Sequence, residues 1–579
     1  MKKNLLTNRQ FIILSSILIG IMVGSAAIIL KSFIHHIYIY TTSNLVGDYK
    51  YFYILLPIIG IFLTVLIVRI FLKGTLEKGL SHIHFAIAKK SSIIGKKQLY
   101  AQIITSSLTV GLGGSAGIEA PIVITGAAFG SNYSNSYHLS YKEKTLLLAC
   151  GIAAGIGAAF NAPIAGVLFS LEILLIDISI TAFTPLIISA ATGALVSKII
   201  LEDDILLSFH LQTPFNYKNV PFYIFLGLLS GLIAVYHSRV FTKIEGLFSH
   251  KKNRVYWNAL IGGSLLAVLI LIFPSLFGEG YQSIKMLAMQ EPEKILSNSF
   301  FENYSSNEWF LLVVIGFLIF IKAIATALTL GAGGNGGNFA PSMFVGAYLG
   351  FFFSKCLNML SLTHLPISNF TIVGMAGVMS GIYHAPLTAI FLIAEITGGY
   401  TLMIPLMIVT SLSYAICKYF EPYSMDTKKL ALEGKIYTND RDYNVLTNIN
   451  TYQLIEKDFQ VVLPDDNLGK IVEIVSKSKR NIFPVTDVEN KLLGLIIFDN
   501  IRDIIFKNEL YQSVTAKDLM TNPPAIIYSN QSMEAVMEKF DESGAWNLPV
   551  VENEQYIGFI SKSRVISSYR EKLKSTTIA

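Results

Sequence analysis

Residues 111–121 read GLGGSAGIEAP, and residues 331–341 read GAGGNGGNFAP. The two stretches agree at six of eleven positions and lie 220 residues apart. A second pair follows in the same order, because NAPIAGVLFSLEI at 161–173 resembles HAPLTAIFLIAEI at 384–396 with an offset of 223 residues. Glycine-rich packing alone is common in membrane helices. Here Pro and Glu recur as well, and the order and spacing are kept, so the chain contains an internal duplication.

The composition indicates that this duplicated chain lies in a membrane. Of its 579 residues, 52% are hydrophobic and only 15% are charged, and the mean hydropathy is +0.54. Such a chain is too apolar for an ordinary soluble globule. The net charge of +6 is modest and no run of five like charges occurs, which argues against nucleic acid as a partner. The cysteines are far apart in apolar stretches and predict neither a metal site nor a disulfide framework: Cys150, Cys356 and Cys417.

The apolar segments predict an all-α polytopic domain over residues 1–424. The first segment is too long for the apolar core of a secretory signal, and the Lys2, Lys3 and Arg9 that precede it favour a cytoplasmic N-terminus. Long runs that approach the ~20 residues needed to span a bilayer cover about 10–34, 51–73, 219–241, 257–276 and 309–331. Runs that are shorter or broken by Gly and Pro cover 99–115, 120–131, 145–160, 163–176, 182–200, 341–355, 370–382, 386–396 and 401–419.

Broken helices at matching places in two halves are typical of inverted repeats with a binding site between them. We therefore predict two inverted-topology repeats, at about 10–200 and 219–420, that bring their glycine-rich loops together.

The sequence changes character near residue 424, after which charged residues occur throughout. Residues 481–505 and 547–566 share an Asn, a Pro-Val pair, a polar turn, a strand with a central Gly and a helix start. An amphipathic helix is predicted before each, at about 468–477 and 531–541. We predict a linker at 425–452 and a pair of small α/β units at 453–510 and 514–574.

The glycine-rich loops predict an anion site. Each feeds a helix whose first turn contains Pro121 or Pro341, a position where no backbone N–H is needed. Such a helix start presents unpaired N–H groups and about half a positive charge, and so attracts anions. Two of these starts facing each other would form a weak cage of donors, and weak binding suits conduction because the ion must also leave.

Glu119 stands at one of these helix starts, where the other half has Phe339. Its carboxylate is itself an anion and could occupy the place of a permeating ion. Protonation, or displacement by an incoming ion, would vacate that place. An acid within a membrane segment is a functional residue by default, so Glu119 is the candidate gate, with a helix-capping acid as the alternative.

These motifs resemble the CLC family of chloride channels and chloride/proton antiporters with a C-terminal pair of CBS domains. The family's GREGP motif corresponds to residues 117–121, its GxFxP motif to 337–341 and its NAPxAGxxF helix to 161–169. The resemblance implies that Glu119 is the external gate and that Tyr423 lines the inner anion site, although a tyrosine here could also be a membrane anchor. The anion-binding positions it implies are Ser81, Gly117, Ile118, Gly337, Asn338, Phe339, Ala340 and Tyr423.

Three departures from the family pattern bear on function. The family's GSGIP loop falls on residues 80–84, LSHIH, which keep only the serine, Ser81, and the isoleucine; an ordinary loop serine is the alternative. Next to the gate, Ile118 replaces an arginine and Ala120 a glycine. The second of two adjacent acids, which carries protons in the antiporters, is replaced by Ile173. Its neighbour Glu172 recurs as Glu395 in the other half, which favours a structural acid.

The loss of an acid at Ile173 favours a passive, voltage- or pH-gated chloride channel, with a chloride/proton antiporter as the alternative. An enzyme acting on phosphate groups is disfavoured, because the His35/His36 and His82/His84 pairs have no adjacent carboxylate. We therefore expect no enzyme activity, no metal and no catalytic residue. A non-conducting sensor is disfavoured by the retained gate and pore motifs.

The resemblance also implies a homodimer with one pore per subunit, in a bacterial inner membrane with the CBS pair in the cytoplasm. CBS domains often bind adenine nucleotides, but the ribose aspartate of the family pattern falls on Asn500 and Arg564, after Ile497 and Ser561. We therefore expect no cofactor and a role for the CBS pair in dimerisation or gating, with nucleotide binding at the pair as the alternative.

Overall fold

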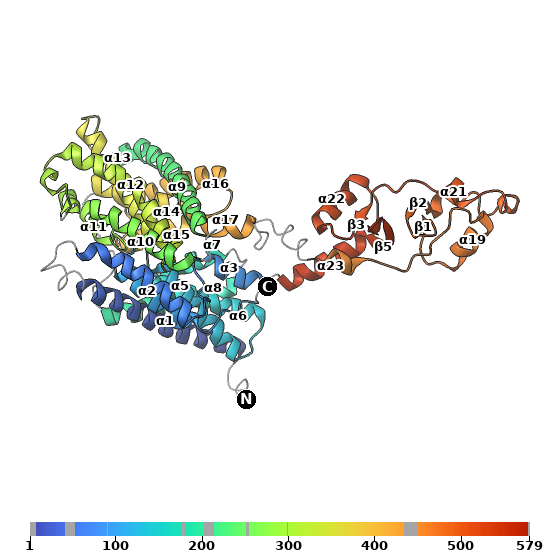
Figure 1. Ribbon diagram of the computed structural model, residues 1–579, viewed down its shortest axis with the longest axis horizontal. Helices are drawn as coiled ribbons and strands as arrows, with labels where there is room; N and C mark the ends of the chain where they lie inside the picture. The colour runs from blue at the N-terminus through green and yellow to red at the C-terminus, as the bar shows by residue number, and fades with distance from the viewer. Residues whose placement is uncertain are drawn as a thin grey trace. The chain divides into compact units, whose positions relative to one another are not determined.

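The chain forms two compact units, Met1–Ile436 and Tyr437–Ala579 (Figure 1). The computed structural model describes residues 7–40, 52–89, 91–174, 180–201, 214–249, 254–297, 299–432 and 449–576.

The first unit is helical. Its first half contains α1 (Asn8–Ile39), α2 (Leu56–Ile70), α3 (Ser81–Lys89), α4 (Gln98–Gly111), α5 (Glu119–Ser136), α6 (Tyr141–Phe160), α7 (Pro163–Leu174) and α8 (Ile180–Leu201). Its second half contains α9 (Val220–Ser249), α10 (Val255–Ile272), α11 (Tyr281–Ala288), α12 (Glu308–Gly331), α13 (Phe339–Met359), α14 (Ile367–Tyr383), α15 (Pro386–Ile396), α16 (Met403–Phe420) and α17 (Met425–Leu432). Among the described residues, eight helices are long and apolar enough to cross a membrane. The predicted all-α polytopic architecture is confirmed.

The two halves end their matching helices in the same way. Asn161 follows α6 and His384 follows α14, and both adopt the left-handed conformation, with φ of 55° and 56°. This conformation ends a helix. In each half an Ala-Pro pair then begins the next helix, α7 or α15, because proline suits a first turn. The predicted break at each NAP or HAP motif is therefore a sharp turn between two helices.

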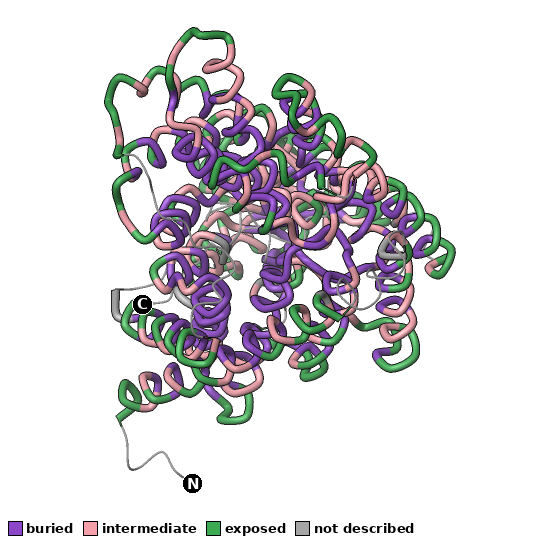
Figure 2. The backbone as a smooth tube through the Cα atoms, turned by 90° about the vertical axis from the view of Figure 1, so that its left-hand side faces the viewer, coloured by how far each residue is buried: buried purple, intermediate pink, exposed green. Residues whose placement is uncertain are grey.

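Glycines allow the inner helices to pack closely in both halves. A Cβ atom at Gly126 of α5 would lie 2.2 Å from the carbonyl oxygen of Gly151 in α6, and one at Gly346 of α13 would lie 2.3 Å from that of Gly374 in α14. Neither position can accept a side chain. Buried residues accordingly gather on the inner helices, and exposed residues on the outer ones (Figure 2).

The second unit contains two similar α/β halves. In the first half, α19 (Leu468–Lys477) precedes β1 (Ile482–Thr486) and β2 (Leu492–Ile497), and in the second, α22 (Met533–Ser543) precedes β4 (Asn547–Glu552) and β5 (Gln555–Ser561). Both strand pairs are antiparallel, and β3 (Ile527–Tyr528) adds parallel to β4. Val485 pairs with Gly494, Val550 pairs with Gly558, and the register shifts just after each valine. The second-unit helices α20 (Phe498–Ile501), α21 (Ala516–Leu519) and α23 (Lys562–Thr576) complete it.

Candidate anion site

The two glycine-rich loops pair directly with each other. The N–H of Gly117 donates to the carbonyl of Gly337 at 2.8 Å, and the N–H of Gly337 donates to the carbonyl of Gly117 at 2.7 Å. Each residue lies two positions before a helix, α5 or α13. This reciprocal pair holds the two helix starts face to face, as the duplication predicts.

Matched threonines at the ends of α4 and α12 support the same arrangement. The N–H of Ser115 donates to Oγ1 of Thr329 at 3.1 Å, and the N–H of Asn335 donates to Oγ1 of Thr109 at 3.0 Å. The four groups are related by the offset of 220 residues, so each half ties down the loop of the other. The loops therefore have a local two-fold relation that is fixed by buried hydrogen bonds.

Glycine is required where the loops meet. A Cβ atom at Gly117 would lie 2.0 Å from Oε2 of Glu119 and 3.1 Å from the backbone nitrogen of Ala340. One at Gly337 would lie 2.8 Å from Cβ of Ala120. The space left by the missing side chains lies between the starts of α5 and α13, and the Glu119 carboxylate occupies it.

Glu119 is the first residue of α5 and is 1% exposed. Its Oε1 accepts a hydrogen bond from the hydroxyl of Tyr281, while Oε2 has no hydrogen-bond partner among the described side chains and sits close to the start of α13. An anionic group therefore lies between two helix N-termini, where the N–H groups and the helix dipoles favour negative charge.

The side chains at the start of α13 are fixed by contacts with other helices. Asn338 precedes α13. Its Oδ1 lies 2.9 Å from Nε2 of His237, and its Nδ2 donates to the sulfur of Met425 at 3.2 Å. The Phe339 ring packs against the rings of Phe160 and Tyr383, at centroid distances of 5.6 and 5.4 Å. Because the side chains are engaged elsewhere, the first-turn N–H groups of α13 remain the polar groups that face the loop pair.

Of the other predicted positions, Ile118 precedes α5 and is 1% exposed, and Ala340 packs beside Gly117. Ser81 begins α3, which packs against α17, and Tyr423 lies two residues before Met425, where α17 begins. Ser81 and Tyr423 are half-buried. The structure thus brings α17 to the start of α13 through Met425 and packs α3 against α17.

Glu172 and Glu395 exchange roles between the halves. Glu172, in α7, accepts from the N–H groups of Leu387 and Thr388 at the start of α15, at 2.9 and 2.7 Å. Glu395, in α15, accepts from those of Ile164 and Ala165 at the start of α7, at 3.0 and 2.8 Å. Each carboxylate caps the helix of the other half, as expected for a matched structural pair. Ile173 lies in α7, and its side chain is outside the described part of the chain.

Three polar residues to which the sequence assigned no role in the site lie in this region. Tyr281 begins α11 and contacts Glu119 directly. Lys322 of α12 is fully buried and donates to Oγ of Ser115 at 2.9 Å, so it does not extend to the membrane surface. Glu279 is close enough to Glu119 for the two carboxylates to interact electrostatically. At the offset of 220 residues Lys322 corresponds to Gln102, which accepts from the Asn335 amide as Ser115 accepts from Lys322. The residue types differ, so the sequence comparison of the two halves does not mark these positions.

Two of the four positions that the CBS pattern would use to bind a nucleotide make hydrogen bonds within the second unit. The hydroxyl of Ser561 donates to Oε1 of Glu456 at 2.6 Å, and the Arg564 N–H contacts the same hydroxyl. Ile497 ends β2, and Asn500 is exposed in α20. Within the described ranges, no group of three or more His, Cys, Asp or Glu side chains could hold a metal ion.

Comparison with known proteins matches both units. Residues 60–418 match the family described as voltage gated chloride channel, and residues 452–507 and 516–571 each match the CBS domain. The voltage-gated ClC-type chloride channel ClcB of Escherichia coli is 28% identical over 317 residues, which cover 54% of this chain and 71% of that protein.

Two solved structures have the same fold. A slow cyanobacterial Cl⁻/H⁺ antiporter aligns with a TM-score of 0.63 and 20% identity over 74% of this chain and 98% of its own. A eukaryotic CLC transporter aligns with a TM-score of 0.60 and 19% identity over 96% of this chain and 97% of its own.

Proposed function

This chain belongs to the voltage gated chloride channel (CLC) family, and from that premise we propose that it carries chloride between the facing starts of α5 and α13, with Glu119 as the gate. The protein is an integral, multi-pass membrane protein of chloride transport and not an enzyme. The observation that carries the proposed path is the position of the Glu119 carboxylate between two paired helix N-termini.

The site suits an ion that must enter and leave. Its donors are the backbone N–H groups of residues 118–120 and 338–340, because those of Gly117 and Gly337 are used in the pair between the loops. An anion is therefore attracted by partial charges. A carboxylate in this place repels chloride by like charge. When Glu119 is protonated, or is displaced by an incoming ion, the same N–H groups become available to chloride. On the other side of α13, Ser81 and Tyr423 are the proposed inner ligands.

Proton-coupled exchange is the form of transport we favour. Titratable groups lie on both sides of Glu119: Glu279 and Tyr281 on one side, and Tyr383 on the other. Tyr383 is close enough to interact electrostatically with both Glu119 and Asp426, an acid of α17 whose Oδ2 is buried and unpartnered among the described residues. These groups provide a proton route that does not need an acid at position 173. The likeness in fold to the cyanobacterial Cl⁻/H⁺ antiporter supports this choice.

Passive conduction remains the second candidate, because the sequence lacks the usual second acid. Ile173 cannot carry a proton, and Glu172 is engaged as a cap of α15. If no proton reaches Glu119 from the cytoplasmic side, its protonation from outside would open the pore without exchange.

We further propose a homodimer in a bacterial inner membrane, with the CBS pair in the cytoplasm. The second unit follows α17, which begins at the residue that contacts Asn338, so a movement of α17 would reach the anion site. For the CBS pair we propose dimerisation or gating without a bound nucleotide. The pairing of Ser561 with Glu456 and the absence of the ribose aspartate support this proposal.

The test is a recording of proton movement in proteoliposomes that have a chloride gradient and no proton gradient. Exchange predicts uphill proton movement in the wild type, and its loss in Asp426→Asn if that acid is on the route. Passive conduction predicts chloride flux with no proton movement in either protein. A protein that folds and moves no chloride would refute both candidates.

A further inference from the structure

A short segment after α10 lies against the gate. Residues 277–281 read FGEGY, and they pack on the first glycine-rich loop. The N–H of Gly278 donates to the carbonyl of Gly113 at 3.2 Å, and a Cβ atom at Gly113 would lie 2.1 Å from the Phe277 ring. The segment therefore sits directly over the loop that leads into α5 and Glu119.

Two side chains fix this segment to the site. The Tyr281 hydroxyl donates to Oε1 of Glu119, and its ring meets that of Phe160 edge-on at 6.3 Å. Lys322 donates to the carbonyl of Gly278 at 3.3 Å and to Oγ of Ser115 at 2.9 Å. The fully buried ammonium thus joins the segment to the glycine-rich loop, and Tyr281 joins it to the gate.

The remaining polar group of the segment is Glu279. Its Oε1 is buried and has no hydrogen-bond partner among the described residues. The Glu119 carboxylate is bonded by Tyr281 on Oε1 and lies close to the backbone N–H of Ala340. The charged groups that interact electrostatically with Glu279 are Glu119, Lys31 and Lys322. The two lysines stabilise one negative charge on the carboxylate pair, while repulsion between the carboxylates disfavours a second. Oε1 of Glu279 is therefore a free oxygen to which a proton can bind.

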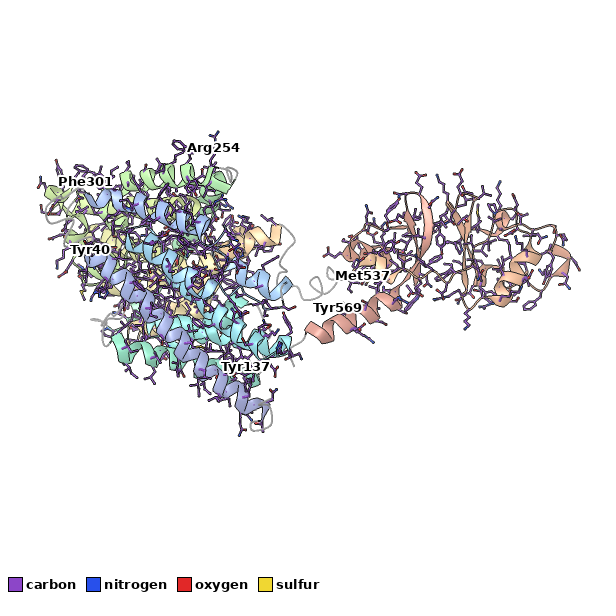
Figure 3. All side chains as sticks on the ribbon, turned by 60° about the horizontal axis from the view of Figure 1, so that its bottom comes forward. Tyr40, Tyr137, Arg254, Phe301, Met537 and Tyr569 are labelled. Carbon is purple, nitrogen blue, oxygen red and sulfur yellow. The ribbon has the colours of Figure 1, made fainter. Side chains whose placement is uncertain are left out.

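The segment lies on the side of the unit away from the cytoplasmic end. Figure 1 shows α11, which begins at Tyr281, at the opposite side of the first unit from α3 and α17. Figure 3 shows the same two ends of the first unit. Tyr40, which follows α1, and Phe301 lie at its left end, and Tyr137 lies at its lower right end. With a cytoplasmic α17, the FGEGY segment faces the extracellular solution.

We propose that Glu279 is the extracellular proton-transfer group for Glu119, and that Tyr281 holds the Glu119 carboxylate in its closed position. A proton from the outer solution binds the Glu279 carboxylate and then passes to the Glu119 carboxylate. One O–H bond breaks and another forms, with no change in oxidation state. The protonated Glu119 no longer competes with chloride for the helix N-termini. This inference rests on the proposed role of Glu119 as the gate.

The experiment is chloride efflux from proteoliposomes at fixed internal pH, with the external pH varied. We compare wild type, Glu279→Gln, Glu279→Asp, Tyr281→Phe and Glu119→Gln. Glu291→Gln serves as the matched control, because Glu291 follows α11 and is an exposed acid paired with Lys294. A positioned proton-transfer group contributes ~100-fold or more to a proton-transfer step. Where protonation from outside limits the rate, we expect Glu279→Gln to slow efflux about tenfold or more.

Glu279→Asp should keep the wild-type dependence on external pH, because it keeps the acid, and Glu291→Gln should match wild type. Tyr281→Phe should raise efflux at high external pH, because the closed carboxylate loses its hydrogen bond. If Glu279→Gln and wild type have the same external-pH profile while Glu119→Gln loses it, the role of Glu279 is refuted and the gate stands. If Glu119→Gln keeps the profile, the proposed gate itself is wrong. If Glu279→Gln does not fold, a Glu279→Asp profile unlike that of wild type would refute the role.

Discussion

The reciprocal capping of α7 and α15 makes a strong prediction about Glu172. If Glu172 is a structural acid, Glu172→Gln should lower stability and leave the ratio of protons to chloride ions unchanged. The carboxylate accepts two backbone N–H groups and the hydroxyl of Thr388 at 2.6 Å, at a helix N-terminus. Neutralising it weakens charge-assisted hydrogen bonds and removes a favourable interaction with the helix dipole, together about 2–3 kcal/mol.

The matched variant is Glu395→Gln. It should destabilise the protein by about 1 kcal/mol less than Glu172→Gln does, because Ala165 stands where the other half has Thr388 and offers no hydroxyl to donate. The control is Glu308→Gln, an exposed first-turn acid of α12 paired with Lys355, for which a change of about 0.5 kcal/mol or less is expected. The assay is denaturant unfolding in detergent, together with proton and chloride flux. A stable Glu172→Gln variant that loses proton movement would refute the structural role.

Two further predictions concern other parts of the chain. Gly117→Ala should abolish chloride flux, because its Cβ would fill the place between the helix starts, 3.1 Å from the backbone nitrogen of Ala340. Gly246→Ala, whose added Cβ would meet no atom within 4 Å, should conduct normally, and a conducting Gly117→Ala variant would contradict the packing of the loops. In the second unit, Arg480 donates to Asp458 and lowers the pKa of that carboxyl. At pH values above the ordinary carboxyl pKa, this exposed ion pair should add about 1 kcal/mol or less to the free energy of unfolding. The contribution should be lost as the pH falls through the lowered pKa of Asp458. Thermal unfolding of wild type and Arg480→Ala across pH 2–6 tests this, and a difference that grows toward low pH would be the wrong sign.

The duplication explains why so much of the site could be predicted from sequence. The two halves have the same residue at matched positions, glycine at 117 and 337 and glutamate at 172 and 395. The sequence itself therefore marks the positions that meet on the local two-fold. The sharp turns at Asn161 and His384 follow from the Ala-Pro pairs after them.

The outer side of the gate could not be predicted in this way. Tyr281 and Glu279 come from the second half and reach Glu119 only through tertiary packing, and Lys322 holds their segment through the carbonyl of Gly278. A lone lysine in an apolar helix is expected to extend its ammonium group to the membrane surface. Lys322 is instead buried, and Ser115 and the carbonyl of Gly278 accept its hydrogen bonds.

The most direct test of the account is to locate a bound anion when the gate carboxylate is neutral. The measurement is the anomalous diffraction of bromide in crystals of Glu119→Gln, compared with wild type under the same conditions. The account predicts a bromide peak in the variant between the starts of α5 and α13, beside the paired glycines Gly117 and Gly337, where wild type has the Glu119 carboxylate. A variant with no peak at that place, and with bromide bound elsewhere along the helices, would contradict it.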